Sequence, residues 1–118
     1  MNFFDSNGNP IAYANEEGQI YLFDGRAIAY IQEGSVYSYS GNHLGRFEDG
    51  WLIDHDGNHV LFSENAQGGP MIPMTRMPPM PAMPQMPPMP AMPQMPPMPQ
   101  MRSLNWSSRS PQEFFGFD

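Results

Sequence analysis

His43, His55 and His59 are the side chains best suited to acid–base chemistry, because imidazole ordinarily titrates near neutral pH. No Gly-x-Ser-x-Gly, His-Glu-x-x-His or phosphate-cradling glycine loop accompanies these histidines. In a hairpin register counted from the nearest turn, His59 lies opposite Asp54, and an ion pair would explain both residues. We therefore predict no catalytic residue, no cofactor and no metal site here, and a protein that is not an enzyme.

Methionine thioethers form the second chemically unusual pattern. From Met71 to Met101 a methionine occupies every third position, and the segment MPPMPAMPQ occurs at 77–85 and again at 86–94. Dense proline favours a polyproline II helix, whose three residues per turn would place all of these methionines on one face. At about 3.1 Å per residue the stripe could extend roughly 90 Å. A globule of 66 residues is only about 28 Å across, so we expect that the arm cannot lie wholly on its own domain.

Three interpretations of this arm remain open. It is either a semi-rigid or disordered low-complexity spacer, or a docking stripe whose adaptable methionines contact an apolar or aromatic-lined groove on a partner. The third is a soft-metal site, since thioethers suit Cu(I). Successive methionines of an extended arm stand about 9 Å apart, so sharing one ion would require the arm to fold back or to pair with another copy.

The C-terminal segment carries aromatic residues of a kind that anchor interfaces. The segment is either a frayed end whose aromatic residues occur by chance or a short linear motif, and such a motif would insert either into a partner or back onto its own ring. The part of the chain after residue 70 that carries this segment has three arginines, too few for nucleic-acid binding. The candidate partner-binding residues are Trp106, Phe114, Phe115 and Phe117.

Charge and composition exclude several classes of function. Residues 1–69 carry ten Asp and Glu against two Arg, whereas residues 70–118 carry three Arg against two acidic residues, so the net charges are −8 and +1. An acidic globular part argues against nucleic acid and makes an anionic membrane surface an unfavourable partner. The chain has no cysteine, which excludes disulfides and zinc–thiolate sites. With no signal peptide or transmembrane stretch visible, we expect a soluble, cytoplasmic protein.

The elements that must position all of these groups repeat every sixteen residues. QIYLFDGRAIAYIQEG, SVYSYSGNHLGRFEDG and WLIDHDGNHVLFSENA follow one another, and NFFDSNGNPIAYANEEG precedes them with one extra residue. Each unit is predicted to be a β-hairpin whose Asx-Gly or Ser-Gly pair forms a two-residue type I′ turn. Counting outward from these turns places a large apolar pair at the same rung each time: Phe4 with Ile11, Tyr21 with Ile28, Tyr37 with Leu44, and Ile53 with Val60.

Four equal hairpins predict an all-β fold closed into a small pseudo-fourfold ring or shallow barrel, because closure protects the strand edges that an open meander would expose. The four units, with turns such as FDG, YSG and HDGN, resemble the bacterial four-fold β-flower proteins over residues 1 to about 66. That resemblance implies a fourfold-symmetric all-β fold, and it implies no activity or catalytic residue.

The sequence thus predicts a four-hairpin domain (1–66), a linker (67–76), a Met/Pro-rich arm (77–101) and an aromatic tail (102–118). The favoured function is a non-enzymatic interaction or scaffold module that contacts an unidentified protein through its arm or tail. The alternative is a binder of a small apolar ligand or lipid on the ring axis, lined by the eight paired residues named above. The sequence leaves self-association open.

Overall fold

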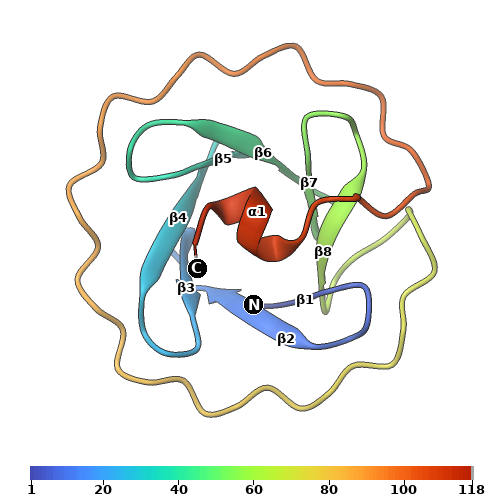
Figure 1. Ribbon diagram of the computed structural model, residues 1–118, viewed down its shortest axis with the longest axis horizontal. Coiled ribbons are helices and arrows are strands. Elements are labelled where there is room, and N and C mark those ends of the chain that lie inside the picture. Colours follow the sequence, from blue (N-terminus) through green and yellow to red (C-terminus); the bar gives the residue numbers. More distant parts are fainter. Residues whose placement is uncertain (118) are drawn as a thin grey trace.

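Eight short antiparallel strands form a closed barrel in the computed structural model, which describes residues 1–117 (Figure 1). Each strand pairs with its neighbours in sequence, and β8 pairs with β1 to close the barrel, so the predicted all-β closed ring is confirmed. The molecule is a disc of 35 × 35 × 25 Å. The strands are β1 (Asn2–Phe4), β2 (Pro10–Ala14), β3 (Gln19–Leu22), β4 (Ala27–Gln32), β5 (Ser35–Tyr37), β6 (His43–Glu48), β7 (Trp51–Ile53) and β8 (His59–Ser63).

The turns differ from the predicted type I′ geometry. Between β1 and β2, the Asp5 amide donates to the Asn9 carbonyl and the Gly8 amide donates to the Asp5 carbonyl, which makes a loop of three residues. Gly8 has a φ of 82°, but the residue before it does not have a positive φ. This is the three-residue hairpin loop that ends in a left-handed glycine. Type I′ geometry occurs instead at the acidic turn after β4, where Glu33 and Gly34 have φ of 51° and 80°.

The longer loop shifts the register by one residue. Phe3 pairs with Ala12 but Phe4 pairs with Pro10, so Ile11 is an extra residue that forms a bulge. The same shift occurs in the β3–β4, β5–β6 and β7–β8 pairs. The predicted pairing of Phe4 with Ile11, and of its three counterparts, is therefore wrong, because the two members of each pair face opposite sides of the barrel wall. The inward set is Ile11, Ile28, Leu44 and Val60, and the outward set is Phe4, Tyr21, Tyr37 and Ile53.

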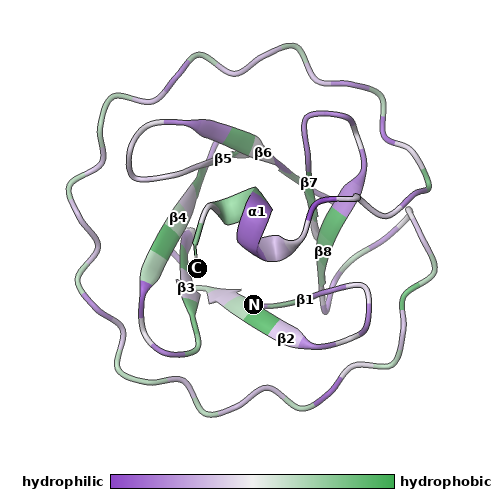
Figure 2. Ribbon diagram, in the orientation of Figure 1, coloured by the Kyte–Doolittle hydropathy of each residue, from purple (hydrophilic) through white to green (hydrophobic). Residues whose placement is uncertain are grey.

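The barrel interior is a small apolar core, and Figure 2 shows hydrophobic residues along the strands that surround it. Side chains of successive strand residues point to opposite faces, except at the bulges, where neighbours such as Ile11 and Ala12 both pack in the core. Phe3, Ile20, Val36 and Leu52 are fully buried and contribute one large side chain from each odd-numbered strand. The core is thus the place where the four sequence repeats converge.

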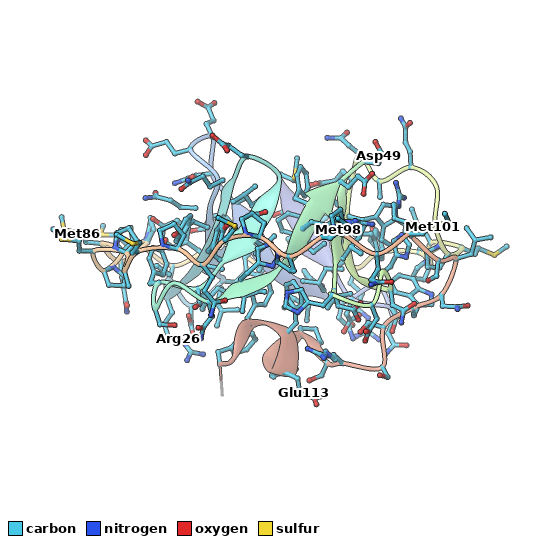
Figure 3. The ribbon with its side chains drawn as sticks, turned by 90° about the horizontal axis from the view of Figure 1, so that it is seen from above. Arg26, Asp49, Met86, Met98, Met101 and Glu113 are labelled. Carbon is cyan, nitrogen blue, oxygen red and sulfur yellow. The ribbon has the colours of Figure 1, made fainter. Side chains whose placement is uncertain are left out.

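A short helix covers one end of the barrel, where the sequence predicted only an aromatic tail. Helix α1 (Pro111–Phe115) begins with a capping box, in which Ser110 accepts from the amide of Glu113 and the Glu113 carboxylate accepts from the amide of Ser110. In Figure 3 the helix lies below the barrel, with Glu113 at the outer edge. Phe114 and Phe115 point back into the barrel core.

Candidate functional site

The Met/Pro-rich arm encircles the barrel as a single extended turn of chain, which we call the belt (residues 70–103) (Figures 1 and 3). The expectation that the arm cannot lie wholly on its own domain is therefore wrong. It compared the arm with the diameter of the globule, whereas the arm follows the circumference. The eleven belt methionines point outward and are 88–93% exposed.

The belt is held at the tip of every hairpin by a hydrogen bond between backbone groups. Its amides donate to the carbonyl of the turn glycine, and the donors are nine residues apart while the acceptors are sixteen or seventeen apart. The four bonds are Arg76 to Gly8 (2.9 Å), Gln85 to Gly25 (2.8 Å), Gln94 to Gly41 (2.8 Å) and Ser103 to Gly57 (2.9 Å). The two periodicities of the sequence are thus structurally coupled.

The length of the belt unit follows from the size of the barrel. Nine residues of extended chain span about 28 Å at about 3.1 Å per residue. One quarter of the circumference of a circle 35 Å in diameter is π × 35/4, or about 27 Å. One MPPMPAMPQ unit therefore advances the belt by the angle that one hairpin occupies. A spacer or a free arm would not need a repeat whose length equals one quarter of the barrel circumference.

Each turn glycine allows the belt to approach closely, which gives a testable prediction. A Cβ on Gly25 would stand 2.5 Å from the carbonyl oxygen of Met83, and the φ of Gly25 is +97°. Gly25→Ala should lower the free energy of unfolding by about 1–2 kcal/mol through backbone strain. It should lose about 1–2 kcal/mol more as the belt hydrogen bonds at that turn break. Chemical denaturation followed by circular dichroism measures the sum of these two losses in the free energy of unfolding.

Gly34→Ala is the matched control for this variant. Gly34 has a comparable φ of +80°, but the atom nearest to an added Cβ is 3.9 Å away. This substitution therefore introduces backbone strain without a clash. Equal destabilisation by the two substitutions would show that the contact between belt and turn contributes no stability.

Arg102 closes the belt on itself. Its guanidinium donates to the Asp49 carboxylate at 2.6 Å and to the carbonyl of Gln67 at 3.1 Å, and the indole of Trp51 donates to that same carbonyl at 3.1 Å. The two ends of the belt therefore meet at one position on the barrel.

Beneath the belt, aromatic side chains fill the outer face where one hairpin meets the next. Tyr13 stacks on Tyr21 with ring centroids 5.5 Å apart, and Tyr30 stacks on Tyr37 at 5.6 Å. Phe62 and Phe4 stack in the same way at 5.5 Å. The hydroxyl of Tyr37 also donates to the Gln94 carbonyl of the belt at 3.0 Å. Burial under the belt raises the pKa of Tyr39 to about 12.

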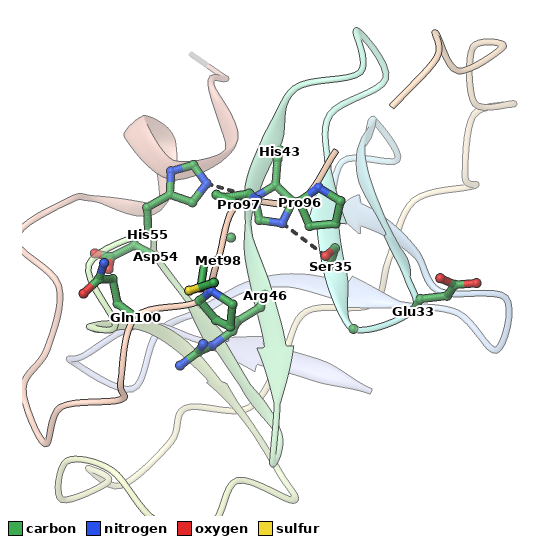
Figure 4. A pocket seen from close by; sticks show the side chains of 13 residues that line it. Glu33, Ser35, His43, Arg46, Asp54, His55, Pro96, Pro97, Met98 and Gln100 are labelled. Carbon is green, nitrogen blue, oxygen red and sulfur yellow. Dashed lines mark hydrogen bonds between the residues drawn. The ribbon is translucent and has the colours of Figure 1, made fainter. Parts of the chain in front are cut away.

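The fourth junction, between β6 and β7, has different chemistry. Arg46 and Ile53 are the paired residues there, in place of an aromatic pair. Under belt residues 96–100 a cavity of about 630 Å³ opens over this junction, lined by Ser35, His43, Arg46 and His55 among others (Figure 4).

The two histidines of this cavity form a hydrogen-bonded line with a serine. Nδ1 of His43 lies 2.9 Å from Nε2 of His55, and Nε2 of His43 lies 3.1 Å from the Ser35 hydroxyl. The imidazole rings stack with centroids 5.1 Å apart. Burial, and secondarily the neighbouring His55, lower the pKa of His43, which favours its neutral form near pH 7.

His59 does not pair with Asp54 as the hairpin register predicted. The bulge places His59 opposite Ile53, where its ring is fully buried against Trp51 and its Nδ1 lies 3.2 Å from the Asn105 carbonyl. The Asp54 carboxylate instead accepts from the amides of its own turn and from the hydroxyl of Ser107. Desolvation lowers the pKa of His59, and a neutral ring suits its apolar surroundings.

The aromatic tail packs on its own barrel, the second of the two outcomes expected for it. Phe114 and Phe115 are only 3% and 5% exposed and lie in the central core. Trp106 lies beside β8 and contacts Trp51 and Phe62 at centroid distances of 5.5 and 6.0 Å. These three residues therefore anchor the tail to the barrel of the same chain. Phe117 is half-buried beside Phe115.

The eight residues expected to line the ring axis divide between two sites because of the bulge. Four face the axis and four lie beneath the belt. Phe114 and Phe115 occupy the axis at the end covered by α1, so the predicted apolar ligand site there is filled by the chain itself. Within residues 1–117, no three His, Asp or Glu side chains lie close enough together to hold a metal ion.

Sequence reasoning missed the belt contacts and the junction cavity. The signal for the belt is the nine-residue repeat, because one such unit in extended form spans the arc that one sixteen-residue hairpin occupies. The signal for the cavity was the replacement of Tyr13 and Tyr30 by Arg46 at the same place in the third repeat.

Comparison with known proteins identifies the family and nothing further. No curated protein and no solved structure matches the chain. Among residues 1–117 there is no helix with the length and apolar character needed to cross a membrane. The family model of the 4-fold beta flower protein matches residues 1–115, a range that takes in the barrel, the belt and helix α1. The chain therefore belongs to the family of 4-fold beta flower proteins.

Proposed function

We propose that this protein is a non-enzymatic interaction or scaffold module that presents its methionine belt to a protein partner. The observation that carries the proposal is the near-complete exposure of all eleven belt methionines on a chain segment fixed at regular points. A methionine is an unfavourable choice for a solvated spacer, because it exposes an apolar side chain that a polar residue would avoid. Exposed apolar surface of this extent is characteristic of interaction sites.

The chemistry of methionine indicates the partner surface. Its thioether is flexible and polarisable, so a row of methionines adapts to irregular apolar grooves and contacts aromatic rings favourably. A polyproline-II-like backbone with one methionine per turn presents these side chains at a constant spacing. The partner is therefore a protein with an apolar, aromatic-lined groove.

Attachment to the barrel lowers the entropic cost of binding. A free arm would lose backbone freedom when it docks, whereas the belt is already ordered by its hydrogen bonds to the turns. The exposed acidic turns, which include Glu16, Glu17, Glu33 and Asp49, favour a groove with a basic rim.

The alternative of an apolar ligand on the ring axis has less support, because Phe114 and Phe115 lie there. Nothing in the geometry favours that function over the belt.

The experiment replaces the belt methionines with a photo-reactive, diazirine-bearing methionine analogue and identifies the proteins that become crosslinked. We expect a crosslink to a defined protein that unlabelled wild type competes away. A variant with Met77, Met80, Met83, Met86 and Met89 changed to Gln should compete at least about tenfold less well, because five apolar contacts are lost.

Leu104→Gln is the control for this competition, since Leu104 is an exposed apolar residue outside the belt. Circular dichroism should show that both variants keep the fold, because none of the changed side chains is buried. If the belt variant competes as well as wild type does, the belt is not the docking surface.

A further inference from the structure

We propose that the cavity over the β6–β7 junction is a binding site for a small organic carboxylate, held between the barrel and belt residues 96–100. This inference goes beyond the belt function, because it concerns the inner side of the belt and a ligand of a different class. At this junction Arg46 pairs with Ile53, whereas the other three junctions of the barrel carry stacked aromatic pairs.

The break in symmetry is confined to the residues that face the cavity. Tyr13, Tyr30, Arg46 and Phe62 occupy equivalent positions, each paired across the junction with an outward residue of the next strand. Three of the four junctions carry a stacked aromatic pair. The aromatic Phe23 and Tyr39, which contact the first two pairs, are matched at this junction by His55. Since aromatic side chains occupy these positions at other junctions of the same barrel, stability alone does not require Arg46 and His55.

Arg46 has a donor that the protein leaves unused. Its Nε is buried and makes no hydrogen bond. The Glu48 carboxylate lies 3.2 Å away and forms an ion pair with Arg46, but it is poorly aligned with the N–H. A buried donor without an acceptor is costly, and a guanidinium matches a carboxylate in both charge and geometry. The Arg46 side chain is 20% exposed and lines the cavity, so an anionic ligand there would pair with the exposed part of its guanidinium.

The remaining polar groups of the cavity are compatible with a carboxylate. Ser35 lies directly opposite Arg46 in the β5–β6 pair, and its hydroxyl is joined to His43 and through it to His55. The acidic groups on the wall are Glu33 and Asp54. Asp54 is already engaged by its own turn and by Ser107, and Glu33 is exposed on its turn.

The belt supplies an apolar wall opposite these groups. Pro96, Pro97 and Pro99 line the cavity, and Figure 4 shows prolines 96 and 97 beside His43. A ligand with a carboxylate at one end and a compact hydrocarbon body would contact both walls. A comparable hollow of about 750 Å³ under Met86–Pro90 is lined by Tyr30, Tyr39 and Glu17 and has no cationic side chain, so it does not offer the same site.

Protonation of His43 should strengthen binding. The pKa of His43 is lowered in the free protein by burial and by His55, so the ring is neutral near pH 7. A bound carboxylate stabilises the imidazolium form of His43 and so raises this pKa. The positive charge of Arg46 opposes the imidazolium, whereas the negative charges of Glu33, Glu48 and Asp54 favour it. Affinity should therefore increase as the pH falls from roughly 8 to roughly 6.

The test uses benzoate as the probe and the neutral, nearly isosteric benzamide as its control. Titration of the full chain is followed by NMR of the His43 and His55 ring protons and by calorimetry. We expect saturable shifts with benzoate, none with benzamide, and tighter binding at the lower pH. Arg46→Gln should weaken benzoate binding at least about tenfold, because a charge-assisted hydrogen bond is lost.

A second variant separates loss of the site from loss of the fold. Arg46→Tyr combined with His55→Phe gives this junction two residue types of the β2–β3 junction, those of Tyr13 and Phe23, so aromatic rings replace the cation and the imidazole and the variant should retain the thermal stability of wild type. This variant should not bind benzoate. The proposed site is wrong if benzoate and benzamide behave alike or if neither shifts the histidine signals. It is also wrong if the double variant binds benzoate as wild type does.

Discussion

Deletion of residues 111–118 is expected to destabilise the barrel by about 3–6 kcal/mol, because it removes two phenylalanines that are buried in the core. Burying a phenylalanine side chain contributes about 1.5–3 kcal/mol, and Phe114 and Phe115 are almost fully buried. Small domains are stable by only about 5–15 kcal/mol in total. Thermal and urea denaturation of the truncated chain, followed by circular dichroism, measures the loss.

Phe114→Ala and Leu104→Ala provide the comparison at single positions. Gly45 leaves room for the Phe114 ring, since an added Cβ there would stand 2.9 Å from it. The alanine at 114 should therefore leave a cavity and cost about 3–5 kcal/mol, whereas Leu104 is exposed and should cost little. If the truncated chain unfolds at the wild-type temperature, the helix is an accessory and not part of the core.

Mild treatment with hydrogen peroxide is expected to oxidise the belt while the barrel remains folded. Each thioether accepts one oxygen atom from the peroxide, which leaves as water, and the product is a polar sulfoxide. The belt methionines are exposed, and the contacts of the belt with the barrel are made by its backbone, prolines and glutamines. Intact-mass spectrometry should show eleven added oxygens, with a twelfth at the half-exposed Met1, and little change in the unfolding temperature.

The same oxidation should abolish docking if the belt is the interaction surface. A sulfoxide cannot enter an apolar groove without losing its hydration, so crosslinking to the partner should fall at least about tenfold. A variant with the belt methionines changed to Leu should keep its binding under peroxide. Unfolding of the wild type at an early stage of oxidation would instead mean that the methionines support the fold.

The parts of the fold that follow from local spacing could be predicted from the sequence. Sixteen-residue units with glycine turns specify strands, turns and a repeating rung, and edge protection then favours closure. The register at the turns could not be obtained in this way. Whether an Asp-Gly pair forms a two-residue or a three-residue loop depends on the strand twist that the loop must join, and the error reversed the side on which Ile11 and its counterparts lie.

The path of the Met/Pro-rich segment was mispredicted because its length was compared with the wrong dimension. An extended chain of about 90 Å exceeds the 35 Å width of the disc, but it fits a circumference of π × 35, or about 110 Å. Helix α1 was missed although Ser110, Pro111 and Glu113 form a capping signature. A helix of five residues has no apolar periodicity to detect, and it is stabilised by the core that its phenylalanines enter.

The agreement between the nine-residue and sixteen-residue units also constrains how such a molecule changes in size. A chain that gained a fifth hairpin would have a wider barrel, and its belt would no longer reach Arg102's partners unless a nine-residue unit were gained as well. Insertion in one half of the gene is thus tolerated only with a compensating insertion in the other. The number of hairpins and the length of the belt must therefore change together.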